Sequence, residues 1–409
     1  MRWWCVAVLA LTSCERTFDD NCSPLVRPSE AIELTTPPFV QVRQRHLRIR
    51  FETPELVTAP ITIVKDGERC TTAIVADVDQ QARTWAKPED PAAAERPDVA
   101  GDYTLHTGKI EGLEPGALYD WAVYTGPAEE DVITGTLRAP PAAGTAATVA
   151  FVGRFAPPAQ AQVMQALGEA DVVLLGGDFV DKDVDESTWT RMANDIFPSG
   201  FSGLIHTVPG DRDDLRPAAM DEVYLRWFGG QGRPGGTDRY YSVDIAGVRI
   251  ITLDGEDERL SIEGGAQWRW LEAELDDIAI DDGLQQAIVV MHKGPYSLTE
   301  RVPNSDLRTD LLPKLIESGV RLVLASDGEA YERFEVDGLT IINEGGGGAA
   351  LGDPDHRVDR DLDAVDARVM SDASFGGVRI SIAEDGSMEL VRVGADGETD
   401  DTVSWGAPE

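Results

Sequence analysis

The chain has 409 residues, enough for two domains that each bury a core, and 42% of its residues are hydrophobic. Its 36 Lys and Arg residues face 73 Asp and Glu residues, which gives a formal net charge of -37. A surface this acidic repels phosphate backbones, so nucleic acids are excluded from the expected partners.

The first residues of the chain predict export and a lipid anchor. Arg2 supplies the positive charge of a signal peptide over residues 1–13, whose apolar part is too short to span a bilayer. The signal ends before Cys14, in a segment that resembles a bacterial lipobox. We therefore expect an exported protein, lipid-anchored to a bacterial membrane in the periplasm or at the cell surface, with residues 14–30 as a tether. An ordinary secretory signal is the alternative.

Two further cysteines remain if Cys5 leaves with the signal and Cys14 carries lipid. Cys22 and Cys70 then form an even pair in an oxidising compartment, which predicts a disulfide. Two free buried thiols are the alternative. The rest of the sequence contains no stretch that is apolar enough to cross a membrane.

Residues 31–140 are expected to form a small all-β sandwich, because short strand-like runs alternate with Pro and Gly turns. The expected strands cover residues 39–51, 61–64, 103–110, 118–124 and 132–137. The loop Leu113-Glu114-Pro115-Gly116, followed by Tyr119, resembles that of a fibronectin type III domain. A Pro- and Ala-rich linker follows over residues 139–147.

Residues 148–400 are expected to form an α/β domain, because apolar strands now alternate with amphipathic helices. The expected strands cover residues 148–153, 171–177, 203–208, 240–245, 248–253, 287–291 and 320–325, with late hairpins near 333–343, 377–383 and 388–393. The expected helices lie near residues 158–169, 187–196, 218–228, 268–275 and 306–318. His206, inside one of these strands, is expected to be structural.

Polar side chains follow five of these strands, where the active residues of α/β sheets cluster. They are Arg154, Asp178, Asp211 with Arg212, His292, and Asp327 with Glu329. Carboxylate and imidazole groups that converge in this way suit a metal ion such as Mn, Fe or Zn.

The order and spacing of these strand ends resemble the calcineurin-like metallophosphoesterases, in the purple acid phosphatase branch. Five further segments support the resemblance, at residues 241–254, 267–271, 292–297, 330–333 and 345–348. It spans residues 35–400 and implies an N-terminal all-β fibronectin type III-like sandwich, followed by an α/β metallophosphoesterase-like β-sandwich flanked by helices.

Members of that family hold two metal ions about 3.5 to 4 Å apart, and a metal-bound hydroxide attacks phosphorus. The resemblance keeps the bridging Asp as Asp178 and the lone His as His292. The other positions are changed. Arg154 stands at the first-strand Asp, Asp181 at a Tyr of purple acid phosphatases, Asp211 at the Asn, Arg212 at the catalytic His, and Asp327 and Glu329 at the paired His.

These changes predict none or one divalent metal ion, and a dinuclear centre is not expected. Arg154, facing Asp178 and Glu329, would repel a cation and pair with both carboxylates, so it is expected to replace the first metal. The candidate single site for Mn, Mg, Ca or Zn consists of Asp178, Asp211, His292 and Asp327. The alternative is a metal-free network of ion pairs among six residues, which are Arg154, Arg212, Asp178, Asp211, Asp327 and Glu329.

No catalytic residue is predicted, because Arg212 stays protonated and cannot shuttle a proton as a histidine would. We therefore predict a surface-anchored pseudo-phosphatase with a binding or scaffolding role. Its ligand would be phosphate-containing or another small anion, and a protein partner is left unspecified. The first alternative is a weakly active phosphoesterase with a single metal at the second site. The second is a purely structural module on the cell surface.

Overall fold

The computed structural model describes residues 3–6, 13–16, 27–43, 46–57, 59–65, 79–86, 102–180, 186–197, 203–214, 223–229, 239–255, 260, 263–281 and 283–407. Cys22, Cys70 and Asp181 lie outside these residues, and Cys14 is described only through the backbone of a strand. The chain divides into two compact units. One comprises Met1–Ala139 and Asp185–Leu204, and the other comprises Pro140–Val184 and Ile205–Glu409. Within the described residues, no helix has the length and apolar character needed to span a membrane.

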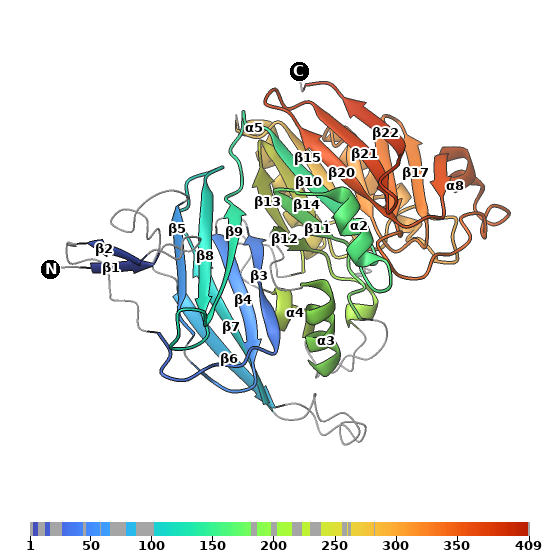
Figure 1. Cartoon of the computed structure of the whole chain (residues 1–409). Helices are drawn as coiled ribbons and strands as arrows, with labels where there is room; N and C mark the ends of the chain where they lie inside the picture. The colour runs from blue at the N-terminus through green and yellow to red at the C-terminus, as the bar shows by residue number, and fades with distance from the viewer. Residues whose placement is uncertain are drawn as a thin grey trace, which may run out of the picture. The chain divides into compact units, whose positions relative to one another are not determined.

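Antiparallel sheets make up most of the first unit (Figure 1). One contains β3 (Thr36–Arg43), β4 (His46–Thr53), β7 (Asp102–Ile110) and β6 (Asp79–Ala86), in that order. Another contains β5 (Ile61–Lys65), β8 (Leu118–Tyr124) and β9 (Val132–Arg138). The unit also includes α3 (Glu186–Ile196) and a short pair, β1 (Trp3–Val6) with β2 (Ser13–Arg16).

The run expected as one strand over residues 39–51 is a hairpin, so that prediction was wrong. Its halves are β3 and β4, which pair Phe39 with Arg50 and Val40 with Ile49. A period of two is the same in both halves of a hairpin, so alternation alone does not reveal where the chain reverses. The reversal buries Phe39 and Phe51 in one unit.

A tyrosine ties the loop before β8 to that strand. The hydroxyl of Tyr119, a buried residue, accepts a hydrogen bond from the backbone N of Glu114 at 2.9 Å. On the neighbouring strand, Gly135 leaves room for the indole of Trp121, since a Cβ there would lie 2.4 Å from the Trp121 ring. These contacts fix the register of β8 against its flanking loop and β9.

The second unit contains two larger sheets (Figure 1). One has the order β22 (Thr399–Trp405), β21 (Met388–Gly394), β20 (Gly376–Ile382), β10 (Ala147–Val152), β11 (Val172–Leu175) and β12 (Leu204–Thr207). The other has the order β13 (Tyr241–Ile245), β14 (Val248–Thr252), β15 (Gln286–Val290), β16 (Leu322–Ala325), β18 (Leu339–Glu344), β17 (Tyr331–Val336) and β19 (Arg368–Asp372). Strands β10 and β11, and strands β14, β15, β16 and β18, run parallel, so their carboxyl ends lie together.

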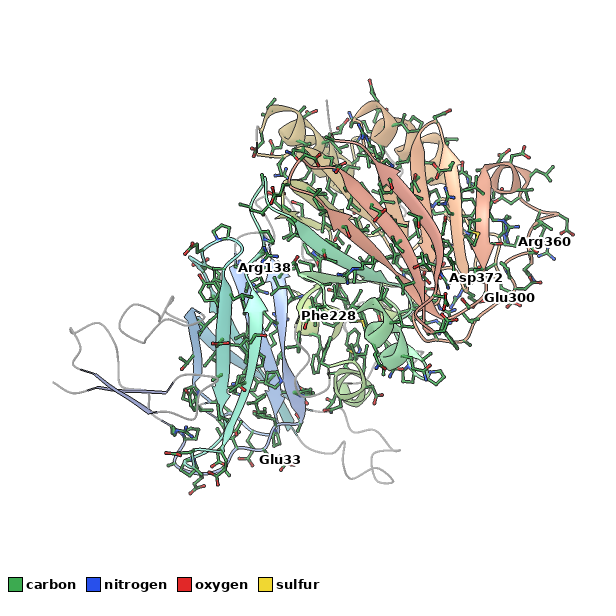
Figure 2. The ribbon with its side chains drawn as sticks, turned by 45° about the horizontal axis from the view of Figure 1, so that its top comes forward. Glu33, Arg138, Phe228, Glu300, Arg360 and Asp372 are labelled. Carbon is green, nitrogen blue, oxygen red and sulfur yellow. The ribbon has the colours of Figure 1, made fainter. Side chains whose placement is uncertain are left out.

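Helices pack on these sheets. α2 (Gln160–Leu167) packs on β20 and β21, and α5 (Ala266–Ile280) packs on β15, where Trp268 and Leu271 enter a large apolar core. α4 (Val223–Phe228) carries Phe228, which Figure 2 labels. The side chain of Phe228 is buried, and its ring centroid lies 4.9 Å from that of Phe179. α8 (Leu362–Ala367) packs on β17. The chain is therefore mostly β-sheet with few helices.

The helix expected over residues 306–318 is broken into α6 (Asp306–Thr309) and α7 (Leu311–Glu317). Pro313 explains the break, because it has no N–H to bond the carbonyl of Thr309 and its ring clashes with that carbonyl in a continuous helix. The late hairpins form as expected, with β17 and β18 joined by Asp337 and Gly338, both at positive φ. The expected helix near 218–228 is described only from Val223.

Candidate metal and anion site

Four side chains converge where strands of the second unit end. Asp178 follows β11, Asp211 follows β12, His292 follows β15 and Asp327 follows β16. Each offers one ligand atom, and these atoms all lie within 4.8 Å of one another. His292, Asp178 and Asp327 are buried, while the Asp211 side chain is 42% exposed, so the group opens to solvent on one side.

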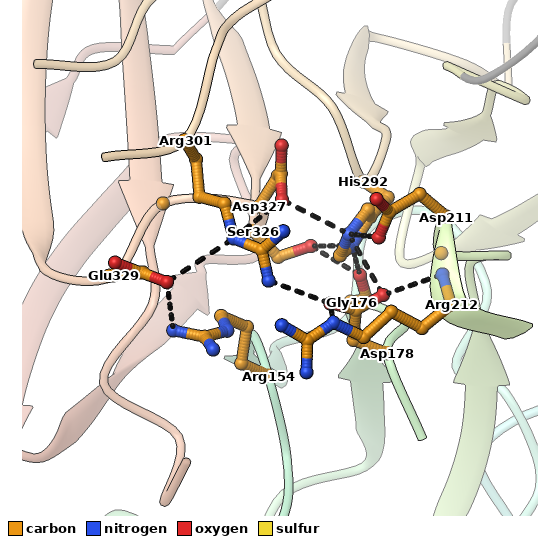
Figure 3. Close-up of polar contacts among 12 residues, drawn as sticks. Arg154, Gly176, Asp178, Asp211, Arg212, His292, Arg301, Ser326, Asp327 and Glu329 are labelled. Carbon is orange, nitrogen blue, oxygen red and sulfur yellow. Dashed lines mark hydrogen bonds and ion pairs between the residues drawn. The ribbon is translucent and has the colours of Figure 1, made fainter. Parts of the chain in front are cut away.

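The imidazole of His292 is held by residues that follow β11 and β16 (Figure 3). Its Nδ1 lies 2.6 Å from the carbonyl oxygen of Gly176 and 3.1 Å from Ser326 Oγ. A carbonyl oxygen only accepts hydrogen bonds, so Nδ1 carries a proton and Nε2 faces the carboxylates. A metal-ligating histidine is fixed by the same kind of second hydrogen bond.

Nε2 of His292 lies 3.2 Å from Asp178, 3.7 Å from Asp211 and 3.6 Å from Asp327. Burial acts to lower the pKa of His292, but these carboxylates outweigh it and raise the pKa well above its usual value. Burial likewise acts to raise the pKa of Asp178, while His292 and neighbouring hydrogen bonds bring it below its usual value. In the absence of a cation, the imidazolium thus neutralises part of the acidic charge.

Four polar atoms in this group make ion pairs at 3.2 Å or more but no well-aligned hydrogen bond among the described residues. They are Asp178 Oδ2, Asp211 Oδ1, His292 Nε2 and Asp327 Oδ1. Leaving a buried polar atom unsatisfied costs about 1–3 kcal/mol, and more when the group is charged. Three carboxylates and one imidazole fit a divalent cation, which would satisfy them together. The four residues could therefore hold a metal ion.

Asp213 joins the two loops that carry Asp178 and Asp211. Its carboxylate accepts hydrogen bonds from the backbone N–H groups of Asp178 at 2.9 Å, Phe179 at 2.8 Å and Gly210 at 2.9 Å. Burial, followed by the charge of Asp178, raises the pKa of Asp213 to about 7. The sequence offered only the loop in which Asp213 lies, because its role depends on contacts with a segment 35 residues away.

Arg154 follows β10 and is only 4% exposed. Its Nη1 donates to the carbonyl oxygen of Ala350 at 3.0 Å and lies 3.6 Å from Glu329 Oε1. Burial lowers the pKa of Arg154. The negative charges of Glu329 and Asp178 act to raise this pKa, whereas the positive charges of Arg301 and Arg212 lower it further. Arg154 thus pairs with one of the two expected carboxylates, Glu329, and its positive charge there disfavours a cation.

Arg212 meets Asp178 directly, at 3.4 Å between Nε and Oδ2, and its backbone N donates to Asp178 Oδ1 at 3.2 Å. The side chain of Arg212 is 24% exposed. Its cationic fork reaches toward the neighbouring arginine side chains (Figure 3). Its guanidinium offers five N–H donors and no acceptor, so it can hold an anion.

Arg301 is a site residue that the sequence analysis did not identify. Its Nε lies 3.3 Å from Glu329 Oε1 and 3.7 Å from Asp327 Oδ1, and its Nη2 lies 3.9 Å from Asp178 Oδ2. It lies in the loop after β15 but well beyond the end of that strand, so its position in the sequence does not mark it as a site residue. Its loop is positioned by the buried Glu332, which accepts from the backbone N of Leu298 at 2.9 Å.

Two other histidines have structural contacts. His206 is buried, contacts the hydroxyl of Thr252 and packs 4.7 Å from the ring of Tyr241. His106 lies 2.8 Å from the hydroxyl of Thr53 in the first unit, and burial lowers its pKa to about 4. Both have the contacts expected of histidines in a folded interior.

Comparison with known proteins supports the fold. No family model matches the chain. Over 105 residues it is 30% identical to an uncharacterized protein of Mycobacterium tuberculosis, found in strains CDC 1551 / Oshkosh and ATCC 25618 / H37Rv, and this match covers 23% of the chain and only 20% of the relative's length.

Two solved structures resemble the chain over most of its length. The purple acid phosphatase PPD1 of yellow lupin (Lupinus luteus) matches with a TM-score of 0.71 at 16% identity, over 90% of this chain and 74% of that one. PhoD matches with a TM-score of 0.57 at 11% identity, over 94% and 90%. The chain has a purple acid phosphatase-like phosphoesterase fold.

Proposed function

We propose that this protein is a pseudo-phosphatase, a phosphoesterase-like fold that binds a small anionic ligand without efficient turnover. The observation that carries the proposal is the buried guanidinium of Arg154, paired with Glu329 at 3.6 Å. A two-metal mechanism needs a second cation to stabilise the developing charge. A fixed positive side chain disfavours that cation and offers it no ligand.

The position of Arg212 supports the same proposal. Proton transfer by a positioned side chain contributes roughly 100- to 10,000-fold to catalysis, and an arginine in that role loses it. Arg212 instead offers a planar fork that suits phosphate oxygens. In this proposal the site binds an anion through its positive side chains and does not transfer a proton to it.

A single divalent cation is part of the proposal, held by Asp178, Asp211, His292 and Asp327. Their four unsatisfied atoms support it, as does the second hydrogen bond that fixes the His292 ring. When bound, such an ion would act as a Lewis acid toward a ligand oxygen. Ser326 and Gly176 would keep the imidazole oriented, and Asp213 would keep the loops of Asp178 and Asp211 in register.

Metal analysis and phosphatase assays on the same purified protein test this function. We expect at most one divalent ion per chain, and negligible hydrolysis of phosphomonoesters and phosphodiesters with Mn, Mg, Zn or Ca. Two ions per chain, or a turnover that His292→Ala abolishes, would overturn it. Arg360→Gln, a substitution at an exposed position outside the site, is the control and should change neither metal content nor turnover.

A one-metal phosphoesterase is the second candidate. The 42% exposure of the Asp211 side chain favours it, because a substrate could reach the cation from that side. Here turnover would depend on one stoichiometric ion and fall with His292→Ala. If the protein were a purely structural module, we would expect neither cation binding nor a rise in melting temperature with any ligand.

We also propose a domain organisation for the chain. We propose residues 31–140 as a fibronectin type III-like domain and residues 148–400 as the phosphoesterase-like domain. The Tyr119 hydrogen bond to Glu114 supports the first, because a tyrosine that bonds back to upstream backbone is a feature of such sandwiches.

We further propose a lipid anchor on Cys14 and a disulfide between Cys22 and Cys70. Membrane fractionation tests the anchor, since Cys14→Ser should move the protein into the released fraction. Mass spectrometry of unreduced peptides tests the disulfide. An unchanged membrane fraction, or alkylation of both thiols in the folded protein, would refute the respective proposal.

A further inference from the structure

Three arginine side chains surround one space beside the four candidate ligands (Figure 3). Arg154, Arg212 and Arg301 approach that space from three different loops. The distances to their carboxylate partners run from 3.3 Å for Arg301 and Glu329 to 3.9 Å for Arg301 and Asp178. Charge-assisted hydrogen bonds are shorter, about 2.7–2.9 Å, so these pairs leave donor capacity unused.

Two of the guanidinium groups have an unsatisfied buried nitrogen. Arg154 Nε and Arg301 Nη2 make no hydrogen bond within the part of the chain that the structure describes. An arginine carries five N–H donors and no acceptor, so only an acceptor can satisfy these atoms. An anion with several oxygens offers acceptors to both.

Like charges also meet in this space. Burial lowers the pKa of Arg154, and the charges of Arg301 and Arg212 lower it further. Holding three cations together costs free energy that nearby carboxylates only partly offset. A bound anion would lower that cost, so the arrangement favours anion occupancy.

Arg301 also faces the candidate cation site. Its guanidinium lies 3.7 Å from Asp327 and 3.9 Å from Asp178, two of the four ligands. In the absence of a cation it neutralises those carboxylates. A divalent ion on them would take over that task, and the positive charge of Arg301 would become available to an anion.

We propose that the three arginines form an oxyanion site for a phosphate group, and that this site binds cooperatively with the cation through Arg301. The inference rests on the single-cation site of the proposed function and adds a linkage between two ligands. Arginine suits phosphate because its planar fork bonds two oxygens at once. The side chains of Arg212 and Arg301 are 24% and 21% exposed, against 5% for Arg154, so the phosphate enters on their side.

The linkage is reciprocal and can be measured without any catalysis. Paramagnetic resonance of free Mn²⁺ gives the cation dissociation constant with and without inorganic phosphate, corrected by a protein-free blank. We expect phosphate to tighten Mn²⁺ binding roughly fivefold to 100-fold, the usual range of coupling between sites. An Mn²⁺ dissociation constant that phosphate leaves unchanged overturns the inference.

Arg301→Gln separates competition with the cation from coupling to phosphate. Without phosphate, this variant should bind Mn²⁺ more tightly than the parent protein, because a competitor for Asp178 and Asp327 is gone. With phosphate, the gain in affinity should shrink by roughly fivefold or more, because the coupling residue is absent. Arg301→Lys should keep the competition and lose part of the coupling.

Arg360→Gln, on the exposed surface, is the control and should behave as the parent protein does. Equal Mn²⁺ affinity in the parent and Arg301→Gln, with full phosphate coupling in both, would refute the role of Arg301. A different result would refute the proposed function. Hydrolysis of phosphate esters would show that the protein is not a pseudo-phosphatase, while the coupling between phosphate and Mn²⁺ binding could still be present. Loss of coupling in a catalytically silent protein would sink only this inference.

Discussion

Glu332 is the residue whose replacement tests most directly how the loop of Arg301 is held. It is fully buried and accepts hydrogen bonds from the Leu298 backbone N at 2.9 Å and the Ser297 hydroxyl at 3.1 Å. Arg368 lies 3.6 Å away. Burial raises the pKa of Glu332 from 4.5 to about 7, although these three neighbours act in the opposite direction.

A raised pKa makes the contribution of this carboxyl group to stability depend on pH. The folded protein retains the proton while the unfolded chain releases it, so the stabilisation is fully present below pH 4.5 and is lost as pH rises to about 7. One pKa unit corresponds to about 1.4 kcal/mol, which gives a loss of about 3 kcal/mol across that window.

Glu332→Gln removes this titration and keeps nearly the same shape. Urea unfolding at several pH values should show the parent protein losing about 3 kcal/mol more than the variant between about pH 4.5 and 8. The variant should be less stable at the acid end by about 1–2 kcal/mol, because its amide places a donor against Asn343. It should match or exceed the parent protein at the alkaline end.

Glu335→Gln, on the same strand but partly exposed, is the control and should leave the pH profile as it is. A parallel pair of pH profiles for the parent protein and Glu332→Gln would contradict the reasoning, because another group would then carry the titration. Glu332→Gln should also weaken the coupling between phosphate and Mn²⁺ binding, because the loop that carries Arg301 loses a carboxylate that holds its backbone.

Three further predictions follow from single contacts. His292→Ala should weaken Mn²⁺ binding at least about tenfold in calorimetric titration, because one ligand is lost; unchanged affinity would place the cation elsewhere. Asp213→Ala should lower the free energy of unfolding by about 1–3 kcal/mol for each of its three N–H partners left unsatisfied, and should weaken Mn²⁺ binding; a neutral effect in urea would deny its role between the loops. Gly135→Ala should lower unfolding stability by about 1–3 kcal/mol, because its Cβ would meet the Trp121 ring at 2.4 Å, and no change would show that the indole moves freely.

Most strands of the second unit could be predicted from the sequence, because parallel strands that are buried on both faces appear as short apolar runs. The runs before Asp178 and His292 are of this kind, and each is entirely buried. The polar residues at the ends of these strands could therefore be located as the first polar side chains after each apolar run. The position of a strand end follows from local pattern, which a single sequence contains.

Arg301 could not be located in that way. Its place depends on Glu332, whose contact with Ser297 joins residues 35 positions apart. The hairpin turn between β3 and β4 was missed for a related reason, since alternation does not mark a reversal. Contacts between distant segments leave no periodic signal, and a single sequence has no other record of them.

Arg154 keeps a backbone conformation at φ 48, in the left-handed region that few residues other than glycine adopt. Aspartate and asparagine are enriched several-fold there, because their short polar side chains hydrogen-bond locally. The main chain therefore suits an acidic residue better than the long base that it carries. Arg154→Asp would therefore meet no backbone barrier, and it would exchange the cation beside Glu329 for a carboxylate that the main chain already accommodates.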